Sequence, residues 1–457
     1  MPTLIEDTIA AISTPIGKSG VGIIRLSGQD SRKITESVFY SAQQTLQDHT
    51  PVLGNIQSSQ SEPVLDEAVV TYFREPRSFT REDVVEISCH GSPVVLKAVL
   101  NLLIEKGARM ATPGEFTLRA YLRGRIDLMQ AEGIRDLIEA KTLFQAQVAR
   151  QRASGSLSKR VKPIKESLIN LIALLEAGID FADDDVSILP DLEIDRRLDD
   201  IIVSLLELDN SFSVGRLIQE GLTVAIVGRP NVGKSSLFNS ILNQNRAIVS
   251  EIPGTTRDIV SETSDLEGMP IRWLDTAGIR ASSSRLENIG VDRSKEVLAE
   301  ADRVLLVFDG SVGLTKDDRA LLGVIKKQPF FLVINKIDLD QKLTQKQLPR
   351  LKVPILRVSS LTGDGIDSLR TLLLGELAGH STLEQDGAFL SNFRQKQQVE
   401  EALKATKESL HSFKKEMPHE VFLIDLHRAL KALNGLTGET TIEDILGNIF
   451  STFCIGK

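Results

Sequence analysis

The chain has 457 residues, of which 41% are hydrophobic and 25% charged, and its formal net charge is −8. This composition is typical of an ordinary soluble globular protein, and the length predicts two to four domains, each with a core of its own. No apolar run is long enough for a helix that spans a bilayer, which also fits a soluble protein. The acidic balance gives no general attraction for nucleic acid, so any contact with RNA must come from a local basic patch.

Two features predict a cytoplasmic location. Residues 1–7 contain early acidic side chains and no arginine-rich or signal-like pattern, so neither export nor organelle import is expected. The sequence has two cysteines, Cys89 and Cys454, which are too few for a disulfide scaffold and suit a reducing compartment.

Residues 1–118 are predicted to form an N-terminal α+β domain. Short β-branched runs bounded by turn residues indicate strands at 8–12, 22–26, 68–73 and 83–87, and apolar residues at helical spacing indicate a helix at 93–104. The next region changes character. Leucine, isoleucine and alanine recur at helical spacing in residues 120–153 and 161–177, and again to about residue 214 after a break between Gly178 and Pro190.

Residues 223–236 are predicted to form a strand, a phosphate-binding loop and a helix. An apolar β-branched run stops at Gly228, and apolar residues resume at helical spacing from Leu237. The loop between them fits G-x-x-x-x-G-K-[ST] with Gly228, Gly233, Lys234 and Ser235. In this motif backbone N–H groups surround the β-phosphate, the lysine reaches the β- and γ-phosphates and the hydroxyl binds Mg²⁺. The helix N-terminus adds a partial positive charge.

The companion motifs of a GTPase follow in order. A second strand ends in Asp275-Thr-Ala-Gly278, suited to holding Mg²⁺ through water and to sensing the γ-phosphate with the Gly278 N–H. A third strand ends in Asn335-Lys-Ile-Asp338, where the Asp338 carboxylate can accept two hydrogen bonds from the guanine edge, which adenine lacks. Residues 358–363 would cover the base. The set resembles the translation-factor-like branch of the P-loop GTPases and predicts a Ras-like doubly wound sheet.

The residues that would drive hydrolysis have to be sought outside these motifs. Ile279 follows the Asp-Thr-Ala-Gly motif, and since isoleucine has no polar group, the attacking water must be oriented from elsewhere. Glu287 is the carboxylate of residues 280–290, and it could be catalytic or a plain surface acid. The Asn231 amide oxygen could hold a monovalent cation beside the phosphates. Loop carbonyls of residues 248–257 could complete its shell, and Thr256 is expected to bind Mg²⁺.

The GTPase module is expected at residues 216–379. Helical spacing returns after it, at 394–413 and 420–433. Neither helical segment has an obvious complete core by itself. The simplest interpretation is one all-α domain, made of residues 119–215 and 380–457, into which the GTPase module is inserted.

The chain end and several N-terminal segments together carry a family resemblance. A cysteine between a hydrophobic helix end and a terminal Gly-Lys could be a buried packing residue or a thiol delivered to a site. The segments are D-T-I-A-A-I (7–12), G-V-G-I-I-R-L-S-G (20–28), F-T-R-E-D-V-V-E (79–86), C-H-G (89–91), P-G-E-F-T-L-R-A (113–120), D-L-M-Q-A-E (127–132) and C-I-G-K (454–457). Together they resemble the MnmE (TrmE) family of tRNA modification GTPases, over essentially the whole chain.

The resemblance implies a function for the whole chain. Members of this family act with MnmG (GidA), a partner that uses FAD and NADH, to place an aminomethyl or carboxymethylaminomethyl group on C5 of the wobble uridine, position 34, of certain tRNAs. A tetrahydrofolate derivative, 5-formyl- or 5,10-methylene-tetrahydrofolate, supplies the one-carbon unit. The N-terminal domain binds folate and forms a homodimer, and the GTPase modules associate in the GTP state in a potassium-dependent way.

The resemblance also implies site residues. Asn231, Ser250, Ile252 and Thr255 would surround K⁺, Ser235 and Thr256 would bind Mg²⁺, and Glu287 would orient the water. Arg25, Glu86, Arg125 and Lys457 would contact folate, and Cys454 would lie near it as a catalytic candidate. Position 125 departs from a common lysine but keeps its positive charge. The expected GTP-binding residues are Asn231, Val232, Gly233, Lys234, Ser235, Ser236, Ser250, Thr255, Thr256, Asp275, Thr276, Ala277, Gly278, Asn335, Lys336, Asp338, Ser359, Ser360 and Leu361.

Alternatives remain open at several of these positions. Arg25, Glu86 and Arg125 could be plain surface charges. Cys89 and His90 are interpreted as structural, because adjacent residues of a strand point to opposite faces. Candidate tRNA contacts, with a solvated helix face as the alternative, are Arg150, Arg152, Lys159 and Arg160. The alternative function is a ribosome-assembly RNA-binding GTPase, for which the terminal Cys-Ile-Gly-Lys and the acidic composition give no support.

Overall fold

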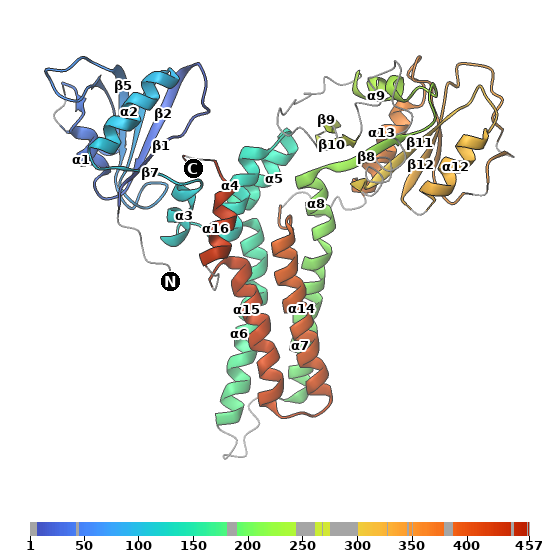
Figure 1. Cartoon of the computed structure of the whole chain (residues 1–457). Coiled ribbons are helices and arrows are strands. Elements are labelled where there is room, and N and C mark those ends of the chain that lie inside the picture. Colours follow the sequence, from blue (N-terminus) through green and yellow to red (C-terminus); the bar gives the residue numbers. More distant parts are fainter. Residues whose placement is uncertain are drawn as a thin grey trace. The chain divides into compact units, whose positions relative to one another are not determined.

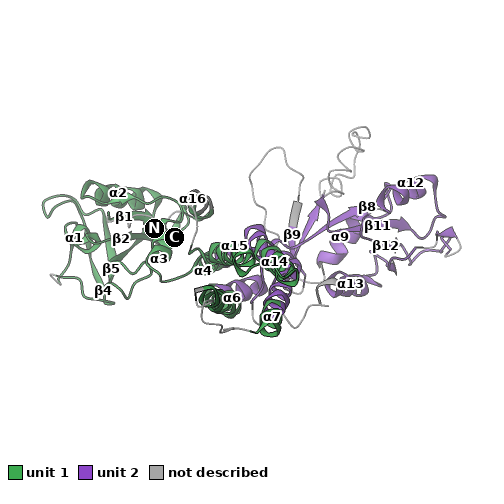
Figure 2. Ribbon diagram, turned by 90° about the horizontal axis from the view of Figure 1, so that it is seen from below, with its two compact units in different colours: residues 1–135, 153–198, 401–457 green, residues 136–152, 199–400 purple. Residues whose placement is uncertain are grey.

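The computed structural model describes residues 7–42, 45–180, 190–243, 261–266, 268–274, 300–326, 328–344, 347–349, 351–378, 387–439, 443–454 and 456. The chain divides into two compact units (Figure 2), of which unit 1 comprises residues 1–135, 153–198 and 401–457 and unit 2 comprises residues 136–152 and 199–400. The unit limits lie within long helices such as α7 (Asp191–Asn210) and α14 (Phe393–Lys414). The domain boundaries expected from the sequence therefore stay a prediction.

The described part of unit 1 contains a seven-stranded sheet in the order β3-β4-β5-β6-β2-β1-β7. Figure 1 labels β1, β2, β5 and β7 of this sheet. The β1–β7 pair is parallel, and the other neighbouring pairs are antiparallel. The strands are β1 (Ile9–Ile12), β2 (Ser19–Ser27), β3 (Phe39–Tyr40), β4 (Pro51–Ile56), β5 (Asp66–Phe73), β6 (Val84–Gly91) and β7 (Arg109–Met110).

One face of this sheet is buried against α1 (Ser31–Glu36) and α2 (Pro93–Glu105). Val85 and Ile87 of β6 enter the same core as Leu103 of α2. Because side chains alternate along a strand, Glu86 lies on the opposite face. The predicted strands and the helix of residues 93–104 are confirmed, with ends that differ by a few residues. The sequence did not predict β3, β4, β7 or α1.

Helices form most of the chain between and after the two sheets. The run expected over 120–153 is divided into α3 (Glu115–Leu122), α4 (Leu128–Glu139) and α5 (Leu143–Ala153). The break after α3 contains Gly124, whose φ of 66° is left-handed. The helical run expected to end near residue 214 continues, because α8 (Phe212–Glu220) follows α7.

The later helical segments are confirmed. Helix α14 covers the first, α15 (His419–Thr437) covers the second, and α16 (Glu443–Ser451) was not predicted. Helix α15 runs antiparallel to α6 (Ser156–Asp180) (Figure 1). The ion pair His427–Glu176 joins the two helices, and Lys165 of α6 pairs with Glu439, which follows the end of α15. No described helix is both long and apolar enough to cross a bilayer.

The sheet of unit 2 has six strands in its described part, in the order β13-β12-β11-β8-β10-β9. Strand β9 is antiparallel to β10, and the other pairs are parallel. The strands are β8 (Leu222–Val227), β9 (Ser261–Leu266), β10 (Met269–Leu274), β11 (Arg303–Asp309), β12 (Phe330–Asn335) and β13 (Ile355–Arg357).

Helices cover both faces of this sheet. Leu305 and Val307 of β11 pack with α9 (Lys234–Asn243) and α13 (Ile366–Ala378), whereas Leu306 and Phe308 pack with α12 (Lys316–Ile325). Strands buried on both faces explain the near-continuous apolar runs of the sequence. The predicted doubly wound sheet is confirmed, and with it the fold class of α/β modules together with an all-α part.

Candidate functional sites

The phosphate-binding motif lies where β8 ends and α9 begins. Asn231 and Gly233 both have left-handed backbones, with φ of 65° and 93°. A Cβ on Gly233 would lie 2.4 Å from Asn335 Nδ2, and one on Gly228 would lie 2.6 Å from the Val307 carbonyl oxygen. Lys234 Nζ donates to the carbonyls of Gly228 at 2.8 Å and Arg229 at 3.0 Å, so the lysine folds over the loop. The two motif glycines are therefore required for close packing as well as for loop curvature.

Asn335 joins the phosphate loop to the loop expected to cover the base. Its side chain is fully buried, and its Nδ2 donates to the Val232 carbonyl at 2.9 Å and to Ser360 Oγ at 3.0 Å. Its Oδ1 accepts from the Ser360 N–H at 3.0 Å. Because every one of these atoms is buried or half-buried, the two loops are held in one arrangement.

Lys336 makes a second link to the phosphate loop. Its Nζ donates to the Asn231 carbonyl at 2.8 Å and to Asp309 Oδ2 at 2.7 Å. Asp309 lies at the end of β11 and is 6% exposed. Burial alone raises the pKa of Asp309, but hydrogen bonds from Lys336 and Ser311 outweigh it and hold the pKa below the usual value. The carboxylate is therefore ionised and anchors the lysine.

Asp338 lies against the base loop. Its Oδ1 accepts from Ser359 Oγ at 2.6 Å, and the same hydroxyl oxygen accepts from the N–H groups of Leu361 at 3.3 Å and Thr362 at 3.1 Å. The Leu361 side chain is 84% exposed. The structure thus brings together the described members of three motifs that lie far apart in the sequence.

The sequence analysis missed two interactions that support this site, those of Asp309 and of Arg229. Asp309 was overlooked because a single acid after an apolar strand is a common pattern. Arg229 Nε donates to Asp318 Oδ1 at 3.2 Å, and Asp318 forms a capping box with Thr315 at the start of α12. The Thr-x-x-Asp spacing was a visible signal of that helix start.

Several predicted site residues lie outside the described residues. For these, the expected roles in binding GTP, K⁺ and Mg²⁺, in catalysis and in folate contact stay predictions. They are Ser250, Ile252, Thr255, Thr256, Asp275, Thr276, Ala277, Gly278, Glu287 and Lys457. Among the expected metal ligands, Asn231 and Ser235 are described, on the loop and at the start of α9. Ser236 follows on the same helix.

In unit 1, Arg25 of β2 and Glu86 of β6 are directly opposite each other across the two strands. Arg25 Nε and Nη2 donate to Glu86 Oε1 at 2.9 and 2.7 Å, and the two side chains are 20% and 27% exposed. The pair lies on the sheet face that is not covered by α1 and α2. Both side chains are half-buried and paired, so neither is a fully solvated charge, and their role in folate contact stays a prediction.

The C-terminal segment lies on this pair. The Gly456 carbonyl accepts from Arg25 Nη1 at 3.3 Å and from Ser13 Oγ at 3.2 Å. Gly456 has a left-handed backbone, with φ of 92°, and a Cβ there would lie 2.6 Å from the Ile12 carbonyl oxygen. The Cys454 carbonyl accepts from the Gly114 N–H at 3.4 Å, and the Cys454 side chain is exposed. The alternative of a buried packing thiol is therefore wrong.

Arg125 belongs to the same neighbourhood. Its guanidinium lies 5.8 Å from the centre of the Phe79 ring and donates to the Ser78 carbonyl. Arg25 lies 5.8 Å from the centre of the Phe116 ring, and Phe79 packs against the cluster that contains Phe116. Arg25 and Arg125 thus each lie beside a phenylalanine ring of one hydrophobic cluster.

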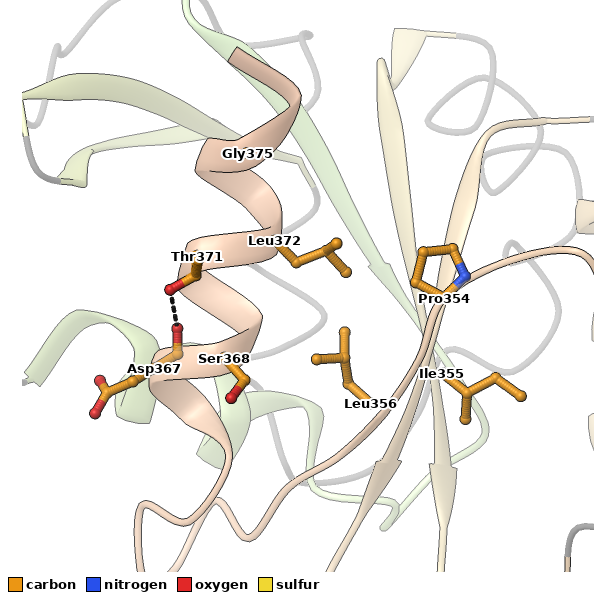
Figure 3. Close-up of a pocket in the computed structure, with 8 residues that line it drawn as sticks. All are labelled: Pro354, Ile355, Leu356, Asp367, Ser368, Thr371, Leu372 and Gly375. Atoms are coloured by element: carbon orange, nitrogen blue, oxygen red, sulfur yellow. Dashed lines mark hydrogen bonds between the residues drawn. The ribbon is translucent and has the colours of Figure 1, made fainter. Parts of the chain in front are cut away.

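An open cavity of about 820 Å³ lies elsewhere in unit 2, between β13 and α13 (Figure 3). Its lining contains none of the predicted site residues. On α13 the Thr371 hydroxyl donates to the Asp367 carbonyl at 2.9 Å, an ordinary contact within a helix. The lining residues are Pro354, Ile355, Leu356, Asp367, Ser368, Thr371, Leu372 and Gly375.

Comparisons with known proteins were decisive for the family. A family model described as the MnmE helical domain matches residues 128–454, and one described as the GTP-binding protein TrmE N-terminus matches residues 8–125. The chain belongs to the MnmE family. Proteins named tRNA modification GTPase MnmE match 99% of this chain over 100% of their own lengths. They include those of Koribacter versatilis at 48% identity, and Thermoanaerobacter pseudethanolicus and Aquifex aeolicus at 41% each.

A solved structure is also similar to part of the chain. The G domain of the FeoB iron transporter of T. maritima matches 34% of this chain and 97% of its own length at 26% identity, with a TM-score of 0.25.

Some of the motifs that this MnmE-family chain carries are structural. Glu115 and Arg119 of the P-G-E-F-T-L-R-A segment are each 2% exposed. Arg119 Nη2 pairs with Glu115 Oε1 at 3.1 Å, and Arg119 Nη1 pairs with Glu82 Oε2 at 3.2 Å. Burial raises the pKa of Glu115, but hydrogen bonds from Arg109, the Thr112 N–H and Arg119 outweigh it, and the pKa is lowered. This buried charge network anchors α3.

The Cys89–His90 pair is also structural, as the alternation of a strand predicted. The Cys89 thiol is buried, and burial together with Asp66 raises its pKa to about 12. His90 is exposed and its Nδ1 lies 2.7 Å from Asp66 Oδ1. No group of three or more His, Cys, Asp or Glu side chains in the described part of the chain is placed to hold a metal ion.

One candidate tRNA contact is wrong. Arg152 is 2% exposed and forms a buried ion pair with Asp136, 2.5 Å from Nη1 to Oδ2. A guanidinium held inside the protein by a carboxylate cannot reach a phosphate. Arg150 and Lys159 are exposed and stay candidates.

Proposed function

We propose that this chain is a potassium-activated GTPase that hydrolyses GTP to GDP and phosphate and acts in the modification of tRNA at C5 of wobble uridine 34. The observation that carries the proposal is the match to MnmE proteins over the whole chain, at up to 48% identity among those named above. The linked Asn335 and Lys336 contacts support the nucleotide part, because they join the loops that the GTPase motifs require.

The proposed GTP site uses the motif residues in separate roles. Lys234 and the N–H groups of residues 232–236 would bind the phosphates, and Ser235 with Thr256 would hold Mg²⁺. Asp338 would accept hydrogen bonds from guanine, while Ser359, Ser360 and Leu361 cover the base. Asp275, Thr276, Ala277 and Gly278 would face the γ-phosphate, with Glu287 orienting the attacking water.

The proposed K⁺ site is supported by the backbone of Asn231. This residue has φ of 65°, which few non-glycine residues adopt, and its carbonyl is held by Lys336 Nζ at 2.8 Å. Because the carbonyl is already engaged, the side-chain amide is the group available to face an ion. Ser250, Ile252 and Thr255 would supply the other ligands, and the bound positive charge would stabilise the charge that develops on the phosphoryl group.

The proposed folate site is built around the Arg25–Glu86 pair. A carboxylate such as Glu86 suits the N–H groups of a pterin, and the cations Arg25, Arg125 and Lys457 suit the carboxylates of the glutamate tail. The Phe79 ring is half-buried and could pack against a flat ring system. A tetrahydrofolate derivative bound there supplies the one-carbon unit. The exposed Cys454 lies in the segment that contacts this pair.

The proposed partners complete the reaction. The chain would form a homodimer through its N-terminal domain and act in the cytoplasm with MnmG, which brings FAD and NADH. It would bind tRNA and would not associate with a membrane. The test is reconstitution with tRNA transcript, MnmG, NADH, GTP and 5,10-methylene-tetrahydrofolate, followed by nucleoside mass spectrometry. A C5-substituted uridine at position 34 that requires GTP and this chain supports the proposal. Equal product without the chain refutes it.

A further inference from the structure

Two interlocked loops lie beside the proposed folate site. One loop contains residues 78–82 and the other residues 123–125. Arg125 of the second loop donates to the Ser78 carbonyl of the first, and Arg81 of the first donates to the Arg123 carbonyl of the second, at 2.9 Å. Each loop thus places one guanidinium on the backbone of the other.

The arginines in and beside these two loops differ in whether a carboxylate neutralises their charge. Arg77 pairs with Asp48, and Arg123 Nη2 pairs with Glu82 Oε1 at 2.8 Å. Arg81 and Arg125 are both exposed, and within the described ranges neither forms an ion pair with a carboxylate. A backbone carbonyl orients a guanidinium but leaves its positive charge uncompensated. Two oriented positive charges are therefore presented by two loops that contact each other.

The backbone conformation of Arg81 supports a role in ligand binding. Its φ is 60°, a left-handed conformation that is uncommon for a residue with a Cβ. Strained backbone of this kind persists where the surrounding structure holds it, and it gathers at ligand sites. A Cβ on Gly124 would lie 3.8 Å from Arg81 Nη1, so the guanidinium extends along a residue that has no side chain to block it.

The position of the pair indicates the ligand. Arg125 stacks on Phe79, which packs against the cluster under Arg25. A folate whose pterin ring lies at Glu86 would direct its glutamate tail away from that residue. Folates carry further glutamates joined through the γ-carboxyl group, and each added residue brings one more carboxylate. Arginine guanidinium groups bind carboxylates in a bidentate way.

We infer that Arg81 and Arg125 form a subsite for the γ-linked glutamates of a polyglutamylated tetrahydrofolate. This inference rests on the proposed folate site and adds the substrate form that the site prefers. Arg125 takes the first carboxylates of the tail, and Arg81 takes those of the added residues. The chain would therefore discriminate between folates by tail length, in a way that weakens as salt is raised.

Isothermal titration calorimetry on the full chain tests this inference, with 5-formyltetrahydrofolate carrying one or three glutamates as the two ligands. We expect the triglutamate to bind about fivefold more tightly to the wild type, the size of one favourable exposed ion pair. The ratio should fall to about one in Arg81→Ala. Arg81→Gly should lower the ratio in the same way. Because glycine adopts the left-handed backbone of this position without strain, this variant separates the loss of the guanidinium from a folding defect.

Arg77→Ala is the matched control, because Arg77 lies in the same region, is 72% exposed and is paired with Asp48. It should keep the preference for the triglutamate. If the wild type binds the two folates with equal affinity, the polyglutamate subsite is wrong and the proposed folate site is unaffected. The same holds if the preference for the triglutamate survives in Arg81→Ala. If neither folate binds, the proposed folate site is wrong as well. If Arg81→Ala weakens tRNA binding and leaves the folate ratio unchanged, the pair serves tRNA and the inference is wrong.

Discussion

Asp309→Asn tests whether the link from β11 through Lys336 to Asn231 holds the nucleotide site in shape. Asp309 Oδ2 lies 2.7 Å from Lys336 Nζ, and the two side chains are 6% and 30% exposed. A hydrogen bond between charged groups contributes about 1.5–3 kcal/mol. Because water reaches part of the lysine, we expect a loss of about 1–2 kcal/mol from the neutral amide. GTP binding requires both the phosphate loop and the loop that contains Lys336 to be in place. A loss of this size therefore corresponds to roughly 5- to 30-fold weaker binding of GTP.

The assay is the dissociation constant of a fluorescent GTP analogue, measured in wild type and Asp309→Asn. Trp273, the single tryptophan of the chain, is fully buried against Phe238 at 5.6 Å between ring centres, so its emission checks that the variant is folded. Asp317→Asn is the control, because Asp317 is an exposed acid in the first turn of α12. An unchanged dissociation constant in folded Asp309→Asn would refute the proposed role of the link.

Four further predictions follow from the sites. Asp338→Asn should weaken GTP and favour xanthosine triphosphate in competition assays, because an amide suits the exocyclic oxygen of xanthine; an unchanged preference for GTP would contradict the proposed base recognition. Glu287→Ala should reduce turnover with little loss of nucleotide affinity, and a normal rate would remove this residue from the mechanism. Replacing K⁺ by Na⁺ should slow GTP hydrolysis, whereas equal rates in the two salts would exclude the cation site. Glu115 has a lowered pKa, so its contribution to the free energy of unfolding is present above its ordinary value of 4.5 and is lost as the pH falls through the lowered value. Melting curves below pH 4.5 should therefore show a smaller acid sensitivity in Glu115→Gln than in the wild type, and parallel curves would contradict this.

The sequence predicted the parts of the fold that depend on local pattern. Buried strands such as β8 and β12 were found because both faces are covered and their residues are almost all apolar. The glycines at 228 and 233 were found by the phosphate-loop motif, and the structure explains the requirement, because a Cβ at either position would clash with a neighbour. Strand β4, by contrast, contains a proline, a glycine and an asparagine, and the exposure of its residues does not alternate along its whole length. The two-residue hydrophobic period that predicts a strand is therefore missing from its sequence.

The sites were predicted less evenly. Arg25 and Glu86 were expected from the resemblance, but their pairing follows from strand register, which the sequence does not give. The contact of Gly456 with Ser13 joins residues 443 positions apart, and no local signal marks it. Arg152 was misplaced because spacing on a helix says which face a residue occupies and not what covers that face.

Nucleoside mass spectrometry of bulk tRNA from cells that lack this protein tests the central claim most directly. Cells would be complemented with the wild type, Cys454→Ser or an empty vector. The account predicts that the C5 modification of uridine 34 disappears in the deletion and returns with the wild type. Its persistence in cells without this protein or a second copy would contradict the assignment and favour a role in ribosome assembly.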